Sequence, residues 1–361
     1  MQLWLIAYVS FVALLSLGLL ALNLRPRKVE SHKAKSSFKP KTLVIVPCKG
    51  MDLTLKENLS SMKSQSYSNY DLMAVADSND DPALNVIKRL KIPYILATGP
   101  LNGASGKVRA ICAAISKMRG YSIYVIADSD VLPEREWLSK MVAPFTDRRV
   151  GMSTAFPIFK PTNGFWPRVK YAWGFVGQGL MESELTRFGW GGSMAFRSDL
   201  IDSKNLRTLR KAVSDDIALT KMVLAKGFKI AYAVDAHVVV NTNDDLKQLL
   251  EWSTRQTALS IAGYGRNYRI ALVFYPANIL VLLSGIALAI LVNPLLALLL
   301  APFAVGAVRT YRRDRDRHPS VLAIYPIMCF FYLGNILAAS RMNRITWRGA
   351  TYSISGLRKP G

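Results

Sequence analysis

The chain opens with an uninterrupted apolar run at residues 3–24, which contains no charged side chain. A helix rises about 1.5 Å per residue, so a run of this length crosses the hydrocarbon core of a bilayer. A cleaved signal peptide carries its basic residues before the apolar run, whereas Arg25, Arg27 and Lys28 follow it here. The pattern therefore predicts a transmembrane anchor over 1–28 whose C-terminal end faces the cytoplasm.

Short apolar runs then alternate with helical patterns up to residue 269. The longer strands are predicted at 42–47, 70–77, 93–98 and 121–128, and the shorter ones at 150–156, 193–197 and 229–235. Helices are predicted near 52–65, 82–90 and 105–118. Apolar strands separated by helices imply a parallel sheet covered on both faces. The predicted fold class is therefore α/β, with one domain over 42–269.

Apolar runs return in the last quarter of the chain, at 270–292, 294–308 and 321–339. Soluble helices would show a polar face, so we expect membrane segments over 270–340, followed by a basic tail at 341–361. The loop at 309–319 and the tail are both basic, and both are expected in the cytoplasm. A full span at 321–339 would separate them, so a full span, a hairpin and a partly interfacial position are all left open for this segment.

One more segment, 164–181, is rich in aromatic and apolar residues and carries two cations. It is typical either of an interfacial segment or of a core helix.

Charge is strongly unbalanced, with 47 Lys and Arg against 24 Asp and Glu and a net charge of +23. Such an excess attracts nucleic acid, an anionic membrane surface or an anionic substrate. The cations lie beside apolar runs, and the sequence has no nucleic-acid recognition motif. We therefore expect a basic linker at 29–41 that lies against anionic lipid headgroups, and no nucleic-acid partner. The three cysteines and three histidines are scattered, which argues against a zinc site and fits a reducing, cytoplasmic compartment.

Polar residues follow three of the predicted strands. Pro47 and Lys49 close the first strand, Asp77 the second, and Asp128 and Asp130 the fourth. In an open parallel sheet, ligands bind outside the carboxyl ends of the strands. Two carboxylates at i and i+2 are hard oxygen donors that suit Mg²⁺ or Mn²⁺ held together with a diphosphate.

A glycine-rich turn at 103–107 precedes the third helix. It is not a P-loop, because Leu101 and Val108 occupy the positions of the required Gly and Ser/Thr. Such a turn can still present backbone amides to phosphate, and Lys107 would add charge. A second glycine-rich run before 193–197 would let the backbone approach a ligand closely.

Paired carboxylates, Asp215 and Asp216, follow Ser214 and precede a helical run. One of these three residues is predicted to cap the helix. Neighbouring carboxylates raise each other's pKa, which suits a general base. Further on, a helical stretch places Gln248, Trp252 and Arg255 on one face.

In this order and spacing, the motifs resemble the inverting family 2 glycosyltransferases, and more closely the related ceramide glucosyltransferase group. The resemblance covers residues 42–270 and recurs in the tail. Its pieces are VPCKGMDLTLKENLSS (46–61), SQSYSNYDLMAVADSNDDPA (64–83), VIADSD (125–130), GGSMAFR (191–197), SDDIALTKMVLAKGF (214–228) and ITWRGATY (345–352). It implies a GT-A nucleotide-sugar domain over 42–269.

The resemblance also implies roles for individual residues. Asp77 would lie near the nucleotide base, and Asp128 and Asp130 would engage the diphosphate and the metal. Asp216 would be the general base, with Asp215 in the preceding acidic position. Pro47, Lys49 and Lys107 complete the expected donor site.

The last family element is Gln/Arg-x-x-Arg-Trp. Gln248 and Trp252 fit it, but Glu251 stands where an arginine is expected, and Arg255 would supply the guanidinium one turn later. The departure argues against a processive polysaccharide synthase. The residues expected to contact the acceptor or the diphosphate are Gly192, Ser193, Gln248, Trp252, Arg255 and Trp347.

The sequence thus predicts an integral membrane glycosyltransferase with a cytoplasmic catalytic domain. It would move a sugar, with inversion, from a nucleotide sugar such as a UDP-sugar to a lipid acceptor. One alternative is transfer to a polyprenyl phosphate. Another is a non-enzymatic transport or scaffold protein with a degenerate nucleotide-sugar domain, against which the intact Asp128, Asp130 and Asp216 argue.

Overall fold

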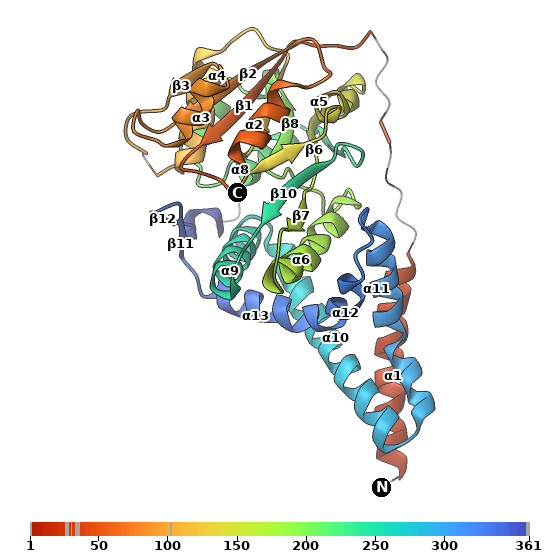
Figure 1. Cartoon of the computed structure of the whole chain (residues 1–361). Helices are drawn as coiled ribbons and strands as arrows, with labels where there is room; N and C mark the ends of the chain where they lie inside the picture. The colour runs from red at the N-terminus through yellow and green to blue at the C-terminus, as the bar shows by residue number, and fades with distance from the viewer. Residues whose placement is uncertain (1, 26–28, 30, 33–36, 102, 359–361) are drawn as a thin grey trace.

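The structure is a computed structural model that describes residues 2–25, 29, 31–32, 37–101 and 103–358. An α/β domain rests on a group of apolar helices, the longest of which extend away from it as a stalk (Figure 1). Within the predicted basic linker at 29–41, residues 30 and 33–36 lie outside the described residues.

The α/β domain is built on a seven-stranded sheet in the order β3-β2-β1-β4-β8-β6-β9. The strands are β1 (Thr42–Cys48), β2 (Tyr70–Ala76), β3 (Tyr94–Leu96), β4 (Ile123–Ala127), β6 (Val150–Thr154), β8 (Ser193–Arg197) and β9 (Lys229–Tyr232). All seven correspond to predicted strands. β1, β2, β3 and β4 pair in parallel, as expected. β8 is antiparallel to both β4 and β6, so the sheet is mixed rather than wholly parallel.

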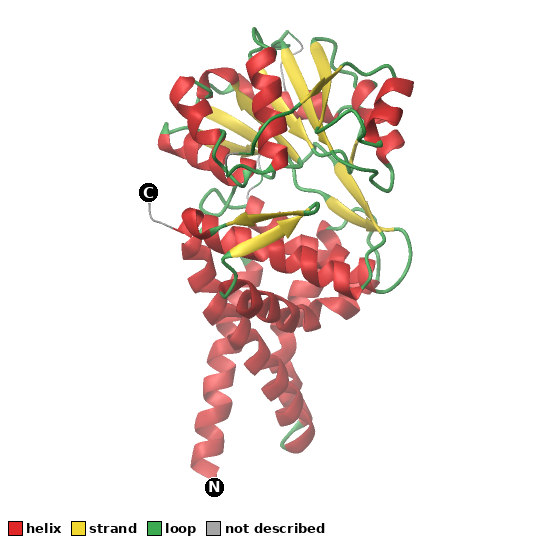
Figure 2. Cartoon of the chain, turned by 90° about the vertical axis from the view of Figure 1, so that its left-hand side faces the viewer, coloured by secondary structure: helices red, strands yellow, loops and turns green. Residues whose placement is uncertain are grey.

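Helices cover both faces of this sheet (Figure 2). They are α2 (Leu55–Lys63), α3 (Ala83–Arg89), α4 (Gly106–Lys117), α5 (Trp137–Val142), α7 (Ser203–Leu209) and α8 (Asp215–Ala225). The first three confirm the predicted helices. Two large apolar clusters lie on opposite faces of the sheet, with Val44 and Val46 of β1 in one and Leu43 and Ile45 in the other. Alternate residues of a strand point to opposite faces, so each side of the sheet has its own core.

A smaller sheet, which the sequence analysis did not predict, joins this domain to the helices below it. Its order is β5-β10-β7, formed by Val131–Pro133, Val238–Thr242 and Ile158–Pro161. Helix α6 (Trp166–Met181) packs beside β7 and is mostly buried, which favours the core-helix interpretation of 164–181. Helix α9 (Leu246–Gly263) follows β10 and starts with a capping box at Asp245 and Gln248.

Four helical segments are long and apolar enough to cross a membrane, as predicted. They are α1 (Gln2–Leu24), α10 (Gly265–Leu291), the pair η3 (Pro294–Leu300) and α11 (Ala301–Arg313), and the run from α12 (Ser320–Ile324) through η4 (Tyr325–Ile327) to α13 (Met328–Ser340). Helices α1, α10 and α11 form the stalk, in which α1 contacts both α10 and α11 (Figure 1). The chain turns at Asn293 and Pro294, so α11 returns toward the domain.

The fourth segment lies differently. Helices α12 and α13 cross above the stalk, beneath the α/β domain, and α13 contacts both α9 and α10 (Figure 1). Pro326 interrupts the run with the 3-10 turn η4. Exposed apolar side chains such as Phe330 and Leu337 remain on this segment. This segment therefore runs across the stalk and not along it, and whether it spans a membrane stays a prediction.

This placement puts both basic segments on the side of the α/β domain. In the 309–319 loop, Arg313 forms an ion pair with Glu182 at 2.6 Å, and Tyr171 donates a hydrogen bond to Asp314. In the tail, Arg348 forms an ion pair with Asp52 at 2.8 Å. Both basic segments therefore contact the α/β domain.

A labelling experiment checks this topology. Asp316 is exposed in the loop, and Leu295 is exposed at the far turn of the stalk. We expect a membrane-impermeant maleimide to reach Asp316→Cys from the side of the catalytic domain and Leu295→Cys only from the other side. Background should be low, because Cys48, Cys112 and Cys329 are buried. Labelling of both positions from one side would contradict the arrangement.

Candidate active site

A polar cavity of about 610 Å³ opens at the carboxyl ends of β1, β2 and β4. Its lining includes all six residues predicted to bind the donor: Pro47, Lys49, Asp77, Lys107, Asp128 and Asp130. Four of the six residues predicted to contact the acceptor or the diphosphate also line it: Gln248, Trp252, Arg255 and Trp347. The structure therefore gathers ten residues from distant parts of the sequence around one space, which we call the polar cavity.

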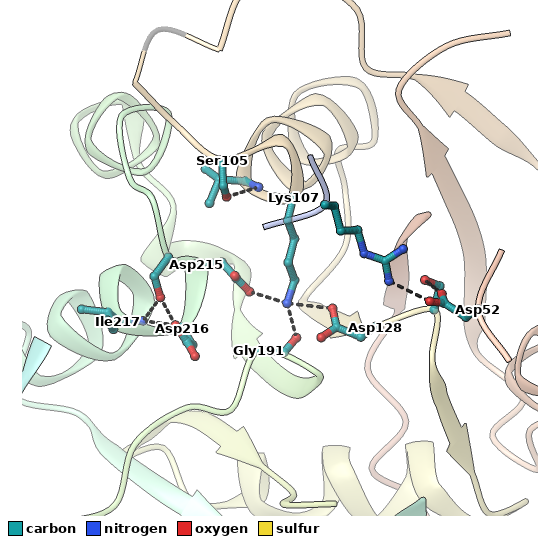
Figure 3. Close-up of polar contacts among 12 residues, drawn as sticks. Asp52, Ser105, Lys107, Asp128, Gly191, Asp215, Asp216 and Ile217 are labelled. Atoms are coloured by element: carbon teal, nitrogen blue, oxygen red, sulfur yellow. Dashed lines mark hydrogen bonds and ion pairs between the residues drawn. The ribbon is translucent and has the colours of Figure 1, made fainter. Parts of the chain in front are cut away.

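Lys107 is the centre of a buried network on the wall of this cavity (Figure 3). Its ammonium lies 2.7 Å from Asp128 Oδ1 and 3.3 Å from Asp215 Oδ2, and it donates to the Gly191 carbonyl at 3.0 Å. Helix α4 presents this side chain because Ser105 caps its N-terminus by accepting from the Val108 amide at 3.2 Å. With three protein partners, Lys107 holds the two carboxylates in place rather than pointing a free charge at phosphate.

The glycine-rich run before β8 serves this network. A Cβ atom at Gly191 would lie 2.8 Å from both Lys107 Nζ and Asp215 Oδ2, and one at Gly192 would lie 2.2 Å from the Trp190 ring. The two glycines therefore make room for side chains of the protein itself. This differs from the prediction that they let the backbone approach a ligand. Gly192 accepts from the Asp128 amide at 3.1 Å. The Ser193 hydroxyl is buried and accepts from the Trp137 indole at 2.8 Å. Neither Gly192 nor Ser193 lines the cavity.

Asp77 lies at the far end of the polar cavity, where β2 ends. Its two oxygens are shared between Lys49 Nζ at 3.1 Å and Arg109 Nη2 at 3.2 Å. Asp77 does not cap the helix that follows it, since Asp81 accepts from the Ala83 amide at the start of α3 at 2.9 Å. Its contact with the nucleotide base stays a prediction.

Asp130 is placed differently from Asp128. Within the described part of the chain it has no hydrogen-bond or ion-pair partner, and burial, together with Asp128 and Asp52, raises its pKa to about 7. The described residues contain no group of three or more His, Cys, Asp or Glu that could hold an ion by themselves. Asp128 and Asp130 nevertheless supply carboxylate oxygens, and the negative charges of Asp128 and Asp52 beside Asp130 favour a cation there. The two residues therefore fit a divalent ion whose remaining ligands are oxygens of a diphosphate.

Helix α9 turns Gln248, Trp252 and Arg255 toward the polar cavity, as predicted. Glu251, which replaces the family arginine, is exposed to solvent instead. The side-chain oxygen of Gln248 accepts from the Asp245 amide at 3.0 Å, so this residue also caps the helix. Burial lowers the pKa of Arg255, and the Glu251 carboxylate opposes that shift.

Sequence reasoning missed one wall of the cavity. The basic tail forms a hairpin of β11 (Arg344–Trp347) and β12 (Ala350–Ser353), which lies between the α/β domain and the helices (Figure 2). At its turn, Arg348 donates to the Lys49 carbonyl and pairs with Asp52. Tyr352 accepts from the Gly106 amide at 3.4 Å. The segment ITWRGATY carried this signal, but of its residues only Trp347 was assigned to the site.

A second cavity, of about 210 Å³, adjoins the first, and we call it the apolar cavity. It lies among α6, α9, α10 and α13, with lining residues such as Trp173, Leu259, Tyr275 and Ile336. Among the described residues that line it, Asp216 is the one acidic side chain, and no lysine or arginine occurs. The structure therefore separates the paired carboxylates: Asp215 is buried against Lys107, and Asp216 faces an apolar space.

The surroundings of Asp216 fix its orientation. It lies in the first turn of α8, where Ser214 is the N-cap. The Ser214 hydroxyl and the Ile217 amide, the latter at 2.7 Å, both donate to Oδ1 of Asp216. Within the described part of the chain, no group donates to Oδ2, so this oxygen is available to a ligand.

Comparison with known proteins identifies the family of the chain. The chain matches the family model "Glycosyl transferase family 21" over residues 6–359. It is 27% identical over 171 residues to ceramide glucosyltransferase 3 of Caenorhabditis elegans. That match covers 45% of this chain and only 37% of the relative.

Two solved structures resemble the fold. The mannosyltransferase PcManGT from Pyrobaculum calidifontis, in complex with GDP-Man and Mn²⁺, has a TM-score of 0.53 at 18% identity and covers 91% of this chain and 97% of its own. Glucosyl-3-phosphoglycerate synthase from Mycobacterium tuberculosis has a TM-score of 0.43 at 14% identity, covering 66% and 88%. The α/β domain has the GT-A fold expected from the sequence. The family model matches almost the whole chain, and three of the predicted carboxylates, Asp77, Asp128 and Asp130, line one cavity. The chain belongs to glycosyl transferase family 21 and is a glycosyltransferase.

Proposed function

We propose that the protein transfers a hexose from a nucleotide-sugar donor to the hydroxyl of an uncharged membrane lipid, with inversion at the anomeric carbon. The observation that carries the proposal is the position of Asp216. Its carboxylate lies in an apolar cavity walled by membrane-associated helices, next to a polar cavity lined by Asp128 and Asp130. One protein thus offers a space for a lipid and a space for a nucleotide diphosphate, with a base between them.

The chemistry follows from this arrangement. Asp216 Oδ2 accepts the proton of the lipid hydroxyl as its oxygen attacks the anomeric carbon. The bond from that carbon to the phosphate oxygen breaks, and the nucleoside diphosphate leaves on the opposite face. A single displacement inverts the configuration. The Ser214 and Ile217 hydrogen bonds to Oδ1 hold the carboxylate in orientation, which is the role of a positioned general base.

The apolar cavity favours a neutral lipid over a polyprenyl phosphate. A phosphate taken out of water needs a cation or several hydrogen-bond donors. The described lining of this cavity offers no lysine or arginine, and Asp216 would repel a phosphate. An alcohol, by contrast, needs one acceptor for its proton. The named relative is a ceramide glucosyltransferase, which agrees with a lipid alcohol as acceptor.

The donor would occupy the polar cavity, and we propose a UDP-sugar. Arg255 and Arg348 line this cavity and would balance the diphosphate charge. Asp128 and Asp130 would hold Mg²⁺ or Mn²⁺, which would act as a Lewis acid toward the departing diphosphate. Mn²⁺ and GDP-Man accompany the mannosyltransferase of similar fold.

The catalytic domain would face the cytoplasm, and the charge pattern supports this orientation. The cations of the 309–319 loop and of the tail lie on its side of the stalk. Positive charge beside membrane helices accumulates in the cytoplasm.

Metal removal gives a direct prediction. We expect a chelator to abolish sugar transfer, and Mn²⁺ or Mg²⁺ to restore it. Asp130→Asn should weaken donor binding as well as turnover, because it removes one oxygen ligand. Asp147→Asn, at an exposed carboxylate paired with Arg149, is the matched control and should retain activity. Full transfer in the presence of chelator would refute the metal assignment.

The function itself is tested by incubating membranes that contain the enzyme with a panel of nucleotide sugars and a lipid extract. Mass spectrometry should detect a neutral lipid whose mass has grown by one hexose residue. A labelled sugar found only on polyprenyl phosphate, or on no lipid, would contradict the proposed function.

A further inference from the structure

The polar and apolar cavities share a wall of aromatic side chains formed by Phe159, Trp190 and Trp252. The inference drawn here rests on the proposed function, in which the diphosphate lies by Asp130 and the attacking hydroxyl by Asp216. The anomeric carbon must lie between those two groups. The sugar ring is therefore expected against the shared wall.

A buried ion pair stands at this wall. Lys170 of α6 and Asp244, just before α9, line the polar cavity, and their Nζ and Oδ2 atoms are 2.8 Å apart. The Lys170 side chain is 8% exposed and that of Asp244 is 19% exposed. The ammonium also lies 4.4 Å from the centroid of the Trp252 ring. That ring packs edge-on against Phe159 at 4.9 Å.

The pair has unused hydrogen-bonding capacity. Within the described part of the chain, Asp244 Oδ2 is the one hydrogen-bond partner of the Lys170 ammonium, which carries three N–H groups. The second oxygen of Asp244 likewise has no donor among the described residues. Placing two charges inside a protein loses their hydration, and replacing such a pair by apolar residues is often neutral or stabilising. Stability alone is therefore a weak reason for these residues, whereas a polar ligand would use the free groups.

We propose that Lys170, Asp244 and the face of Trp252 form the hexose-binding subsite. Asp244 accepts hydrogen bonds from sugar hydroxyls, Lys170 donates to their oxygens, and the apolar face of the ring packs on the indole. An aromatic surface with a few placed polar groups is the usual construction of a site that fixes orientation. The subsite recognises the sugar and not the nucleotide, so it discriminates between nucleotide sugars and the free nucleoside diphosphate.

The test compares binding of a donor with binding of its nucleoside diphosphate to the full-length enzyme by calorimetry. The donor is whichever of UDP-glucose, UDP-galactose, UDP-N-acetylglucosamine and GDP-mannose binds the wild type most tightly. The double variant Lys170→Met with Asp244→Asn removes both charges at similar volume, so neither is left buried and unpaired. We expect its affinity for the donor to fall roughly ten- to a hundredfold, since hydrogen bonds to charged groups are lost. Its affinity for the nucleoside diphosphate should change by less than about twofold.

A second buried pair supplies the control. Glu182 at the end of α6 pairs with Arg313 at 2.6 Å, and both residues lie outside the polar and apolar cavities. Glu182→Gln with Arg313→Met should leave the ratio of the two affinities unchanged. Equal losses for donor and diphosphate in the Lys170–Asp244 variant would overturn the assignment, and so would no loss for either. The measurement contains no lipid, so it stands whether or not the proposed acceptor is right.

Discussion

Asp216→Asn is expected to lose about 10²–10⁴ in turnover, because the variant can no longer take the proton of the acceptor hydroxyl. Nucleotide binding should stay normal, since Asp216 lines the apolar cavity and not the polar one. The fold should also persist, because an asparagine oxygen can still accept from Ser214 and Ile217. Transfer rates and nucleotide affinity, measured on the same preparation, check both expectations.

Two neighbouring variants sharpen this experiment. Ser214→Ala removes the helix cap and should cost on the order of 1 kcal/mol of stability. Its turnover should fall less than that of Asp216→Asn, because the Ile217 amide still donates to Oδ1 of Asp216. Asp215→Asn should be milder in turnover than Asp216→Asn, since Asp215 is buried against Lys107 and does not face the acceptor. If Asp216→Asn turns over normally while Asp215→Asn is inactive, the base is the other carboxylate. If both retain activity, the proposed mechanism fails.

Lys107→Met is expected to have the largest effect on stability. The Lys107 ammonium joins Asp128, Asp215 and the Gly191 carbonyl in a buried network (Figure 3). Removing one partner of a buried ionic group leaves uncompensated charge and typically costs about 3–5 kcal/mol. Chemical denaturation of the purified full chain should show this loss. Lys140→Met, which breaks a partly exposed pair with Glu136, should cost less than about 1 kcal/mol.

Two further measurements identify the cause as electrostatic. Adding Asp215→Asn to Lys107→Met should recover part of the stability, because it removes one of the two carboxylates that have lost their cationic partner. The loss should also shrink at low pH. Burial raises the pKa of Asp215, and Lys107 opposes that rise, so removal of Lys107 leaves the native pKa of Asp215 further above the unfolded value. The penalty is therefore present at neutral pH and disappears as both states become protonated. If the loss of stability does not depend on pH and Asp215→Asn does not reduce it, the cause is altered packing and not charge.

The sequence predicted those strands of the sheet that are marked by a continuous apolar run. The runs that became β1, β2 and β4 are continuously apolar because helices cover both faces of the sheet. The direction of β8 could not be read in this way, because an apolar strand looks the same in either direction. The chain enters β8 through Gly191 and Gly192, which the side chains of Lys107 and Trp190 approach closely, and the strand pairs antiparallel with both β4 and β6.

Other features depend on contacts between distant segments. The alternation of β10 at 238–242 is short, and it forms a strand because it pairs with β5 and β7. Lys107 looked like a phosphate ligand, since no sequence pattern shows that Asp215 lies beside it. The two carboxylates at 215 and 216 were treated as a pair, but successive residues of a helix point in different directions. One therefore joins the polar network and the other the apolar cavity.

The hairpin at 344–353 bears on how this enzyme is made. Arg348, Trp347 and Tyr352 complete the wall of the polar cavity, yet in the chain they follow all four candidate membrane spans of the described residues. During synthesis the α/β domain emerges first, and the polar cavity stays open until the last helices have formed and the hairpin has returned to it. A water-soluble fragment limited to the α/β domain would lack that wall and most of the apolar cavity. Membrane insertion thus acts as an assembly step for the active site as well as a means of anchoring it.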